Sequence, residues 1–540
     1  MPHVNTEGRG GTTPPRDRRR VVVGSVTGLL AVGAALGAAE LVAGLTGSVS
    51  PVVAVGDVVV DATPAILMEW AIALFGTADK IVLVTGIVVV LFAAGAVLGV
   101  LALRRPALGY AGPAVFAAAG LAAVLLRRAD DPWAAAPVVA GAVAGALALA
   151  LLLRSARTVH GPGRKGRPQA PADAEVTRPQ VGPAQGPGRR GFVLTATGVL
   201  AGSATAGVIG RWLPDALGGA GARSQLALPA AAQPLSALPA ATDLGLPGLT
   251  PFSTPNADFY RIDTALTVPR LDSTRWRLRV HGMVDEPFEI DMDALLAMPL
   301  VEADITLTCV SNQVGGDLAG NSRWLGFPLA DLLRRAGVQE GADQILSTSD
   351  DGWTCGTPTE VVMDGRDALL AVGMGGEPLP YSHGYPARMV VPGLYGFVSA
   401  TKWVTDIKLT RFADEKAYWA RRGWAVRAPI KVMSRVDVPA PLGRVPSGDV
   451  VLAGVAWAQH RGVDAVEVRI DGGEWWPADL AEVPGIDTWV QWVAEADLAP
   501  GNHTVEVRAT DAAGRTQTSE RAEPIPDGAS GWHSIRFTAE

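Results

Sequence analysis

Cysteine is scarce in this chain: only Cys309 and Cys355 occur among 540 residues. Two cysteines exclude a fold that is held together by several disulfide bonds. A single bridge between them stays open on the sequence alone. Such a bridge would compete with a metal for the same sulfur atoms.

Histidine and net positive charge are also in short supply. The chain has seven histidines, and none lies in the apolar segments 21–47, 81–103, 107–126 and 133–153. No Cys-x-x-Cys-His motif occurs, so a haem inside a bilayer has no ligands and no haem is predicted. The net charge of −7 argues against a nucleic-acid partner.

Long apolar runs are what the first half of the sequence does contain. At about 1.5 Å per residue, each of the four segments given above is long enough to cross a hydrocarbon core of about 30 Å. Phe192–Leu213 is a fifth, weaker span. Thr63–Gly76 is short and carries Glu69, so we expect it to lie at the interface or to fold back. The pattern predicts an N-terminal α-helical membrane bundle.

Basic residues indicate the orientation of this bundle. Arg16–Arg20, Arg104-Arg105 and the linker after Arg154 lie on one side if successive spans alternate. The positive-inside rule places that side in the cytoplasm, so everything after Leu213 is expected to be extracytoplasmic. Arg189-Arg190 before the fifth span is typical of a twin-arginine export signal, but the pair would also serve as simple cytoplasmic anchors.

The second half of the sequence has a different pattern of apolar and polar residues. Strands are expected at 276–281, 305–309, 344–347, 389–391 and 402–409, with short helices at 292–298 and 329–336, which together predict an α+β domain. After about Arg427, short strands at 450–458, 465–470, 489–494 and 503–509 alternate with Gly-rich turns. This second pattern is typical of an immunoglobulin-like β-sandwich.

The chain is therefore predicted to be a multidomain protein. Its expected parts are a cytoplasmic N-terminus (1–20), a four-span transmembrane region (21–153), a basic disordered cytoplasmic linker (154–190), a fifth span with the twin-arginine-like signal (191–213), a flexible tether (214–250), a catalytic domain (251–425) and an immunoglobulin-like C-terminal domain (426–540).

Cys309 closes the run Asp304–Cys309, in which Ile305 and Leu307 alternate with polar residues. Such alternation is typical of a half-buried strand, which would deliver the thiol to the mouth of the following loop. A thiolate on a rigid element is a good ligand for a soft transition metal. A buried cysteine that packs as a small hydrophobe is the alternative interpretation.

Further motifs lie downstream. His383-Gly-Tyr-Pro-Ala-Arg388-Met-Val-Val-Pro-Gly393 is followed by Lys402-Trp403. With the cysteine strand, this combination resembles the sulfite oxidase family of molybdenum enzymes over roughly residues 250–540. The resemblance implies a sulfite oxidase-type molybdopterin domain followed by a sandwich that forms dimers in many members. It also implies a molybdenum–molybdopterin cofactor.

The resemblance assigns roles to particular residues. Cys309 would be the molybdenum ligand and the catalytic residue. Cations and hydrogen-bond donors would hold the pterin and its phosphate, for which the planar fork of arginine is well suited. The implied cofactor contacts are Tyr260, Arg261, Asp350 or its neighbour Asp351, His383, Arg388, Ser399 and Lys402.

The loop after the cysteine departs from the family. Animal and plant-type sulfite oxidases have arginines there that bind sulfite, whereas this chain has Asn312–Gly316. Less positive charge makes sulfite a poorer fit and a sulfoxide-like substrate at least as reasonable, although Arg261 or Arg323 would compensate if either faced the site.

The predicted function is oxygen-atom transfer by a multi-pass cell-membrane oxidoreductase, on a small oxo-anion or sulfoxide-like substrate. Because no second redox centre is encoded, an external electron carrier, cytochrome or quinone-linked, is required. Membrane lipid and a second copy of the chain in a homodimer are the other expected partners. The alternatives are a catalytically inactive membrane-tethered binding or sensor module and a thiol-redox protein with a Cys309–Cys355 bridge.

Overall fold

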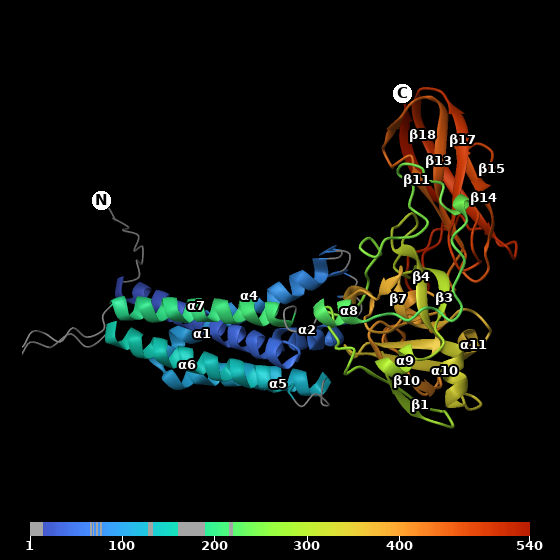
Figure 1. The fold of residues 1–540 in the computed structure, drawn as a ribbon. Helices are drawn as coiled ribbons and strands as arrows, with labels where there is room; N and C mark the ends of the chain where they lie inside the picture. Colours follow the sequence, from blue (N-terminus) through green and yellow to red (C-terminus); the bar gives the residue numbers. More distant parts are fainter. Residues whose placement is uncertain are drawn as a thin grey trace, which may run out of the picture. The chain divides into compact units, whose positions relative to one another are not determined.

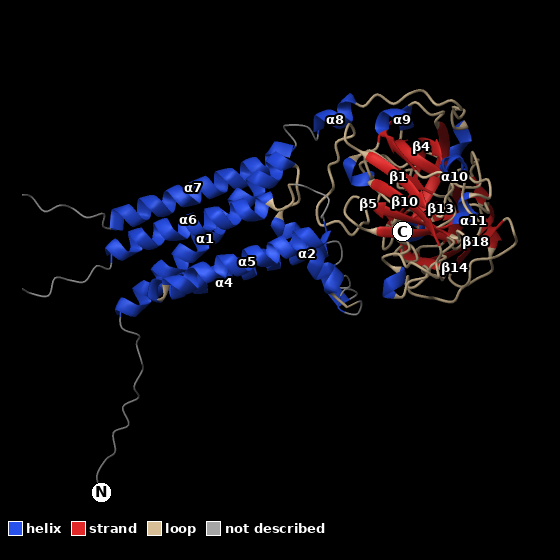
Figure 2. Ribbon diagram, turned by 90° about the horizontal axis from the view of Figure 1, so that it is seen from below, coloured by secondary structure: helices blue, strands red, loops and turns tan. Residues whose placement is uncertain are grey.

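The computed structural model describes residues 15–64, 67, 70–71, 74–75, 78–127, 133–159, 189–214 and 220–540. The chain forms two compact units, Met1–Gly218 and Gly219–Glu540. The described part of the first unit is helical, and the strands belong to the second (Figures 1 and 2). Of the predicted disordered linker 154–190, residues 154–159 and 189–190 are instead helical, and residues 160–188 lie outside the described residues, as does part of the stretch 63–76.

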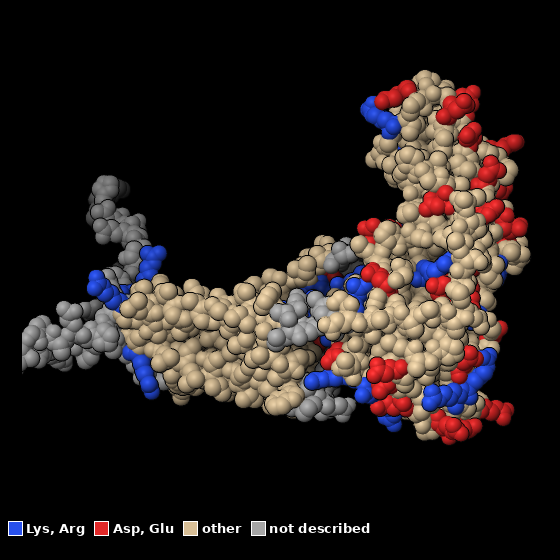
Figure 3. Space-filling view, viewed as in Figure 1, with Lys and Arg blue, Asp and Glu red and all other residues tan. Residues whose placement is uncertain are grey.

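Long helices build the first unit. They are α1 (Pro15–Thr46), α2 (Pro51–Ala62), α4 (Asp79–Arg104), α5 (Pro106–Arg127), α6 (Ala136–Val159) and α7 (Arg189–Pro214). All but α2 are long and apolar enough to cross a membrane. Each of the five spans expected from the sequence corresponds to one of these helices, although the span 21–47 extends past Thr46 and the span 133–153 begins before Ala136. The helix α2 was not expected. The flanks of the helices show almost no charged atoms on the face in Figure 3.

Small residues bring these helices into close contact. A Cβ atom at Gly28 of α1 would collide with the carbonyl group of Gly95 in α4, and one at Gly37 would collide with Ser203 of α7. Gly145 of α6 packs in the same way on Ala35. Backbones that approach this closely are typical of helix packing in membranes.

The contacts along α1 fix the direction of its neighbours. Gly24 faces Val100 and Gly28 faces Gly95, so α4 runs antiparallel to α1. Gly145 and Gly141 of α6 face successively later residues of α1, which makes α6 antiparallel as well, whereas α7 runs parallel because its Ser203 and Gly210 face Gly37 and Gly44. Arg18–Arg20, Arg104-Arg105, Arg154 and Arg190 therefore lie at one end of the bundle, whereas Lys80, Arg127 and Arg211 lie at the other.

Two sheets form the first part of the second unit. One has the order β2-β1-β10-β5-β6, and the other has the order β3-β4-β7-β8 with β9 paired to β7. The strands are β1 (Arg277–Gly282), β2 (Phe288–Asp291), β3 (Val301–Thr308), β4 (Ala319–Pro328), β5 (Gln344–Ser349), β6 (Thr354–Pro358), β7 (Leu369–Met374), β8 (Glu377–Pro378), β9 (Arg388–Val390) and β10 (Val404–Thr410).

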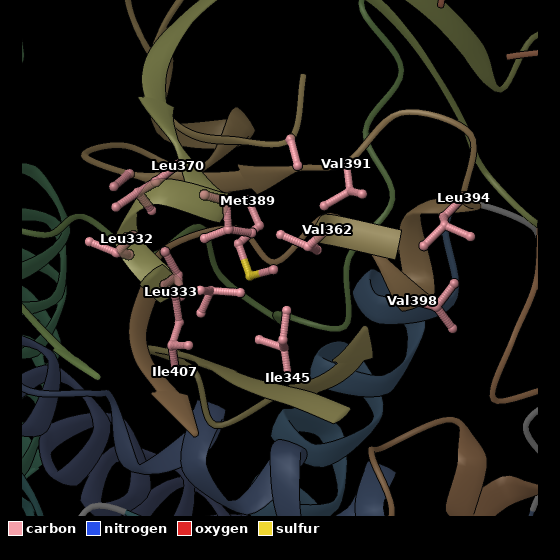
Figure 4. Packing of buried hydrophobic residues seen from close by; sticks show 14 of the residues in the cluster. Leu332, Leu333, Ile345, Val362, Leu370, Met389, Val391, Leu394, Val398 and Ile407 are labelled. Atoms are coloured by element: carbon pink, nitrogen blue, oxygen red, sulfur yellow. The ribbon is translucent and has the colours of Figure 1, made fainter. Parts of the chain in front are cut away.

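Short helices cover these sheets: α9 (Met292–Leu296), α10 (Leu329–Ala336) and α11 (Thr359–Val362). The helix predicted at 329–336 is confirmed, and it ends where Gly337 adopts φ +66°. A left-handed residue at this position is a normal helix stop that favours glycine. Leu332 and Leu333 of α10 pack against Ile345, Met389 and Ile407 of the sheets (Figure 4).

Two further sheets complete the chain and share one core. Their orders are β11-β13-β17-β16 and β12-β19-β18-β14-β15. Leu452 and Trp492 of the first sheet pack with Val468, Val507 and Phe537 of the second. The strands are β11 (Met433–Val438), β12 (Arg444–Val445), β13 (Gly448–Trp457), β14 (Val463–Ile470), β15 (Trp476–Pro477), β16 (Asp479–Leu480), β17 (Val490–Leu498), β18 (Gly501–Asp511) and β19 (His533–Ala539).

The segment that the sequence predicts as a flexible tether, 214–250, differs from that expectation from residue 220 onward. It begins with α8 (Ala220–Gln225), whose Arg223 lies 2.9 Å from the carboxylate of Glu377. The Ala232 amide donates to the Leu300 carbonyl at 2.7 Å. Leu228 packs against the core. The Ala/Leu/Pro composition therefore covers the sheets of this unit and does not form a free linker.

Candidate active site

Cys309 follows the last residue of β3. This strand pairs antiparallel with β4 from Val301 opposite Gly326 to Thr308 opposite Ala319, so the cysteine stands where the two strands turn. Its amide donates to the Leu318 carbonyl at 2.9 Å, and its carbonyl accepts from the Asn312 amide at 3.0 Å. The residue is 8% exposed. The thiol is thus fixed on a rigid element and nearly closed off from water.

Residues from the C-terminal sheets hold this strand and its loop. The Gln459 side-chain amide donates to the Thr306 carbonyl and to the Thr308 hydroxyl, both at 3.1 Å. Arg435 donates to the Gly316 carbonyl at 2.7 Å. Sequence reasoning missed Gln459 and Arg435, because neither lies in a recognisable motif and both act across more than 100 residues of chain.

Burial raises the pKa of the Cys309 thiol, while the amide and hydroxyl of Ser311 and the charge of Lys402 act in the opposite direction. Cys355 is a separate buried thiol whose pKa burial raises to about 11. Both cysteines are free. The bridge on which the thiol-redox alternative depends is therefore not formed in this structure.

Arg388 is a buried guanidinium without a countercharge. It is 4% exposed, donates to the His383 carbonyl at 3.1 Å, and lies 5.1 Å above the ring of Trp324. No carboxylate pairs with it anywhere in residues 220–540, all of which the structure describes, and burial lowers its pKa to about 10. An uncompensated buried cation is costly unless an anion joins it.

Two further cations share one carboxylate. Lys402 and Arg261 each lie 2.8 Å from Asp263. Burial lowers the pKa of Lys402 to about 8, and the charge of Arg388 adds to this effect. The cluster therefore gathers three cations around Asp263, and Asp351 is also close enough to Asp263 for their charges to interact. Asp263 was missed from the sequence because it lies in a stretch without a distinctive motif.

His383 lies in the same cluster as a neutral side chain. Burial and the charges of Arg388 and Lys402 lower its pKa to about 4. Its Nε2 atom lies 3.1 Å from the Asn256 carbonyl, which requires a proton on that nitrogen. The ring also packs edge-on against Phe259.

Tyr260 connects the cation cluster with the thiol. Its phenol is close enough to Cys309 and Arg388 for both to affect its pKa, which burial raises far above the ordinary value. Its ring stacks on Phe259 at 5.2 Å. Tyr260 therefore supplies a neutral hydroxyl near both a sulfur and a cation.

The remaining candidates lie nearby with less direct roles. The Asp350 amide donates to the Trp403 carbonyl at 2.8 Å. Burial raises the pKa of Asp351, and the charges of Asp263 and Asp350 raise it further. The Ser399 hydroxyl is directed at the carbonyls of Leu394 and Tyr395, 3.1 and 3.0 Å away. A cofactor contact from Ser399 would therefore come from its backbone, and this role stays a prediction.

His533 supports the cysteine loop and predicts a response to acid. Its Nδ1 accepts from the Val436 amide at 3.0 Å, and its ring lies against Gly315. Burial and the charge of Arg435 lower its pKa from 6.5 to about 4, although Asp437 acts in the opposite direction. The unfolded chain then binds the proton more readily, so stability is expected to fall as the pH drops from about 6.5 toward about 4.

The variant His533→Asn keeps an acceptor for the Val436 amide but cannot titrate in this range. Thermal unfolding of the purified full chain at pH 7.5 and 5 is expected to show a smaller loss of stability in this variant than in the wild type. An equal loss in both proteins would contradict the role of His533.

Comparison with known proteins indicates the family to which the chain belongs. The family model for the oxidoreductase molybdopterin-binding domain matches residues 265–419. The uncharacterized oxidoreductase YuiH of Bacillus subtilis is 33% identical over 156 residues, which cover 29% of this chain and 75% of that protein. Human mitochondrial sulfite oxidase is 28% identical over 307 residues, which cover 47% of this chain and 55% of the enzyme.

The sulfane dehydrogenase SoxCD from Paracoccus pantotrophus is a similar solved structure, with a TM-score of 0.48 and 22% identity over 54% of this chain and 84% of that chain. The chain spans about half the length of the human sulfite oxidase that it matches, 55%. It belongs to the molybdopterin-binding oxidoreductases of the sulfite oxidase family. It is a molybdenum-dependent oxidoreductase.

Proposed function

We propose that the chain is a membrane-anchored, extracytoplasmic oxidoreductase that transfers an oxygen atom, with Cys309 as the molybdenum ligand. The observation that carries this proposal is the buried, uncompensated guanidinium of Arg388, which, like Cys309, lies close enough to Tyr260 to affect the pKa of that phenol. A pterin phosphate would supply the missing negative charge, and arginine binds phosphate through paired hydrogen bonds.

The residues of the cluster fit the remainder of the cofactor. Arg261, Lys402 and Arg388 provide charge, whereas neutral His383 and the Tyr260 hydroxyl provide hydrogen bonds. The indole nitrogen of Trp353 is buried without a protein partner and is a further available donor. When bound, the cofactor supplies oxygen-atom transfer coupled to two electrons. The protein would hold it, orient it and exclude water.

The charges near the cysteine loop favour an uncharged oxo substrate, such as a sulfoxide, over a small oxo-anion. Arg323 is committed to Asp304, with contacts of 2.9 and 2.8 Å. Arg261 is committed to Asp263, and the loop Asn312–Gly316 carries no cation. Both arginines that would compensate for the neutral loop, Arg261 and Arg323, are thus already paired with a carboxylate. An anion would find less attraction here than in an arginine-lined pocket.

The helical unit supports a membrane location. Five helices are apolar enough to span a bilayer, and more of the basic residues at helix ends lie at one end of the bundle than at the other. That end would face the cytoplasm, which places the end of α7 and the catalytic unit on the other side. Arg189-Arg190 would then serve as the twin-arginine signal that exports a domain already loaded with its cofactor.

The C-terminal sheets and the electron partner complete the proposal. Two sheets over one core suit the expected immunoglobulin-like sandwich, and the family resemblance suggests that it joins two copies into a homodimer. An external carrier, cytochrome or quinone-linked, would exchange electrons with the site.

Metal and cofactor analysis of the purified full chain tests the proposal. Expression in a molybdopterin-producing host should give close to one molybdenum per chain and a releasable pterin. Dimethyl sulfoxide should then be reduced when dithionite-reduced viologen is the electron donor. Protein that carries neither metal nor pterin under these conditions would overturn the assignment. Accessibility of single introduced cysteines in intact cells would separately test the topology.

A further inference from the structure

A short series of aromatic rings runs from the candidate site toward solvent. The ring of Phe397 lies 5.2 Å from that of Trp424, which stacks on Trp419 at 4.3 Å. Tyr418 continues the series, 5.1 Å from Trp419. Phe397, Trp419 and Trp424 are each partly exposed.

The inner end of this series lies against the cysteine strand. Phe397 belongs to the short 3-10 helix η5 (Gly396–Val398), and a Cβ atom at Gly396 would lie 3.9 Å from the Thr308 carbonyl. Thr308 directly precedes Cys309. Tyr395, which caps η5, is close enough to Cys309 for the charges to interact. Only one peptide unit and one ring contact, that of Phe397 with Trp424, therefore separate the segment beside the thiol-bearing strand from the stacked tryptophans.

The outer end has its own local geometry. The Trp424 amide donates to the Trp419 carbonyl at 3.1 Å, and Gly423 adopts φ +88°, so a tight turn holds the two indoles face to face. Phe397 and Trp424 contact the main core, but Trp419 projects beyond it. Core packing accounts for the inner rings, whereas the outer indole is not part of the main hydrophobic core and packs on Trp424 and Tyr418.

The surface around the tryptophans is basic in an acidic protein. Between residues 414 and 427 there are four basic side chains and two acidic ones, against a net charge of −7 for the whole chain, and one of the four, Arg427, is paired with Glu360, 3.2 Å away. Lys416 and Arg421 are exposed and make no ion pair with a described residue. Glu415 is paired with Lys408, 2.8 Å away. The segment around Pro526 is a neighbour of this surface, because the Ala425 amide donates to the Pro526 carbonyl at 3.2 Å. It carries two acids: Asp527 is paired with Lys431, 2.9 Å away, and Glu523 is exposed.

We propose that Phe397, Trp424 and Trp419 form the route by which electrons pass between the site at Cys309 and a one-electron carrier protein with an acidic docking surface. This inference rests on the proposed function and names its partner. During sulfoxide reduction, two reduced carrier molecules each deliver one electron to the site, and the same route runs in reverse when a reduced site is mixed with an oxidised carrier. The rings act as a conduit, and none is itself oxidised. Lys416 and Arg421 attract the carrier, because complementary charge accelerates association.

Pre-steady-state oxidation of the molybdenum-loaded full chain tests this route. The enzyme is reduced with dithionite, freed of excess reductant, and mixed with one of three oxidants. Two are c-type cytochromes of similar potential, one with an acidic and one with a basic surface around the haem edge, and the third is the small dye dichlorophenolindophenol. The acidic cytochrome should react faster than the basic one, and more so at low salt.

The variants Trp419→Leu and Trp424→Leu should slow reduction of the acidic cytochrome several-fold and leave the dye reaction unchanged. Trp419→Phe, which retains a ring, should recover much of the rate. Arg421→Glu should lower the cytochrome rate on the order of tenfold at low salt. Trp475→Leu is the matched control, since Trp475 is also a partly exposed indole beside an arginine, with Arg469 at 4.7 Å.

The outcomes separate this proposal from the one on which it rests. A chain that binds no molybdenum, or that cannot be reoxidised by the dye, overturns both. A chain that reacts with the dye but shows equal cytochrome rates in the wild type and the tryptophan variants overturns the aromatic route alone. A preference for the basic cytochrome overturns the acidic partner.

Discussion

Replacement of Cys309 by serine is expected to abolish turnover and to leave the full chain with little molybdenum. A serine hydroxyl is a harder and far less acidic ligand than a thiolate, so the bond to a soft metal is lost. Loss of an outer-shell contact alone costs about 10–100-fold in metal affinity or activity, and loss of the ligand should exceed this. Metal analysis and the dimethyl sulfoxide assay measure both effects.

Cys355→Ser provides the matched control. Cys355 is fully buried and lies 3.7 Å from the Thr357 hydroxyl, so serine fits the same space and finds a hydrogen-bond partner. This variant is expected to keep its molybdenum and its turnover. Full activity in Cys309→Ser, or an equal loss in both variants, would remove Cys309 from the chemistry and return it to the role of a buried hydrophobe.

The sequence predicts those elements whose signals are local. The strand before Cys309 alternates apolar and polar residues, and helix 329–336 carries its own stop at Gly337. The segment 220–250 failed as a prediction because its Ala/Leu/Pro composition suits a linker and a surface cover equally well. Only contacts with distant partners, such as Arg223 with Glu377, decide between these two states.

The same distinction applies to the site. His383, Arg388 and Lys402 lie within 20 residues of one another, and the structure brings them together as the motif indicates. Asp263 joins Lys402 across 139 residues, and Gln459 joins the cysteine strand across 151 to 153 residues. Such partners are chosen by the tertiary fold, which a single sequence does not encode as a local pattern.

Arg388→Met is expected to have opposite effects on the two states of the protein. In cofactor-free protein, the variant replaces an uncompensated buried cation with an apolar side chain of similar length. Removal of that unpaired charge should raise the free energy of unfolding by about 1–3 kcal/mol. In the presence of cofactor, the same variant loses paired hydrogen bonds to a phosphate. Each such bond contributes about 1.5–3 kcal/mol, so cofactor retention should fall by at least about 100-fold.

Arg323→Met separates this effect from a general loss of arginine. Arg323 is paired with Asp304, whose side chain is only 6% exposed, so its removal leaves a buried carboxylate without a partner. That variant should be destabilised by about 3 kcal/mol in the cofactor-free protein and should keep the cofactor when folded. Thermal unfolding of both variants, produced in a host that does not make the cofactor, measures the change in stability. Pterin analysis of both variants, produced in a host that makes the cofactor, measures how much cofactor each retains. If Arg388→Met also destabilised the cofactor-free protein, Arg388 would be part of the fold, and the anion-binding role on which the proposed function depends would fail.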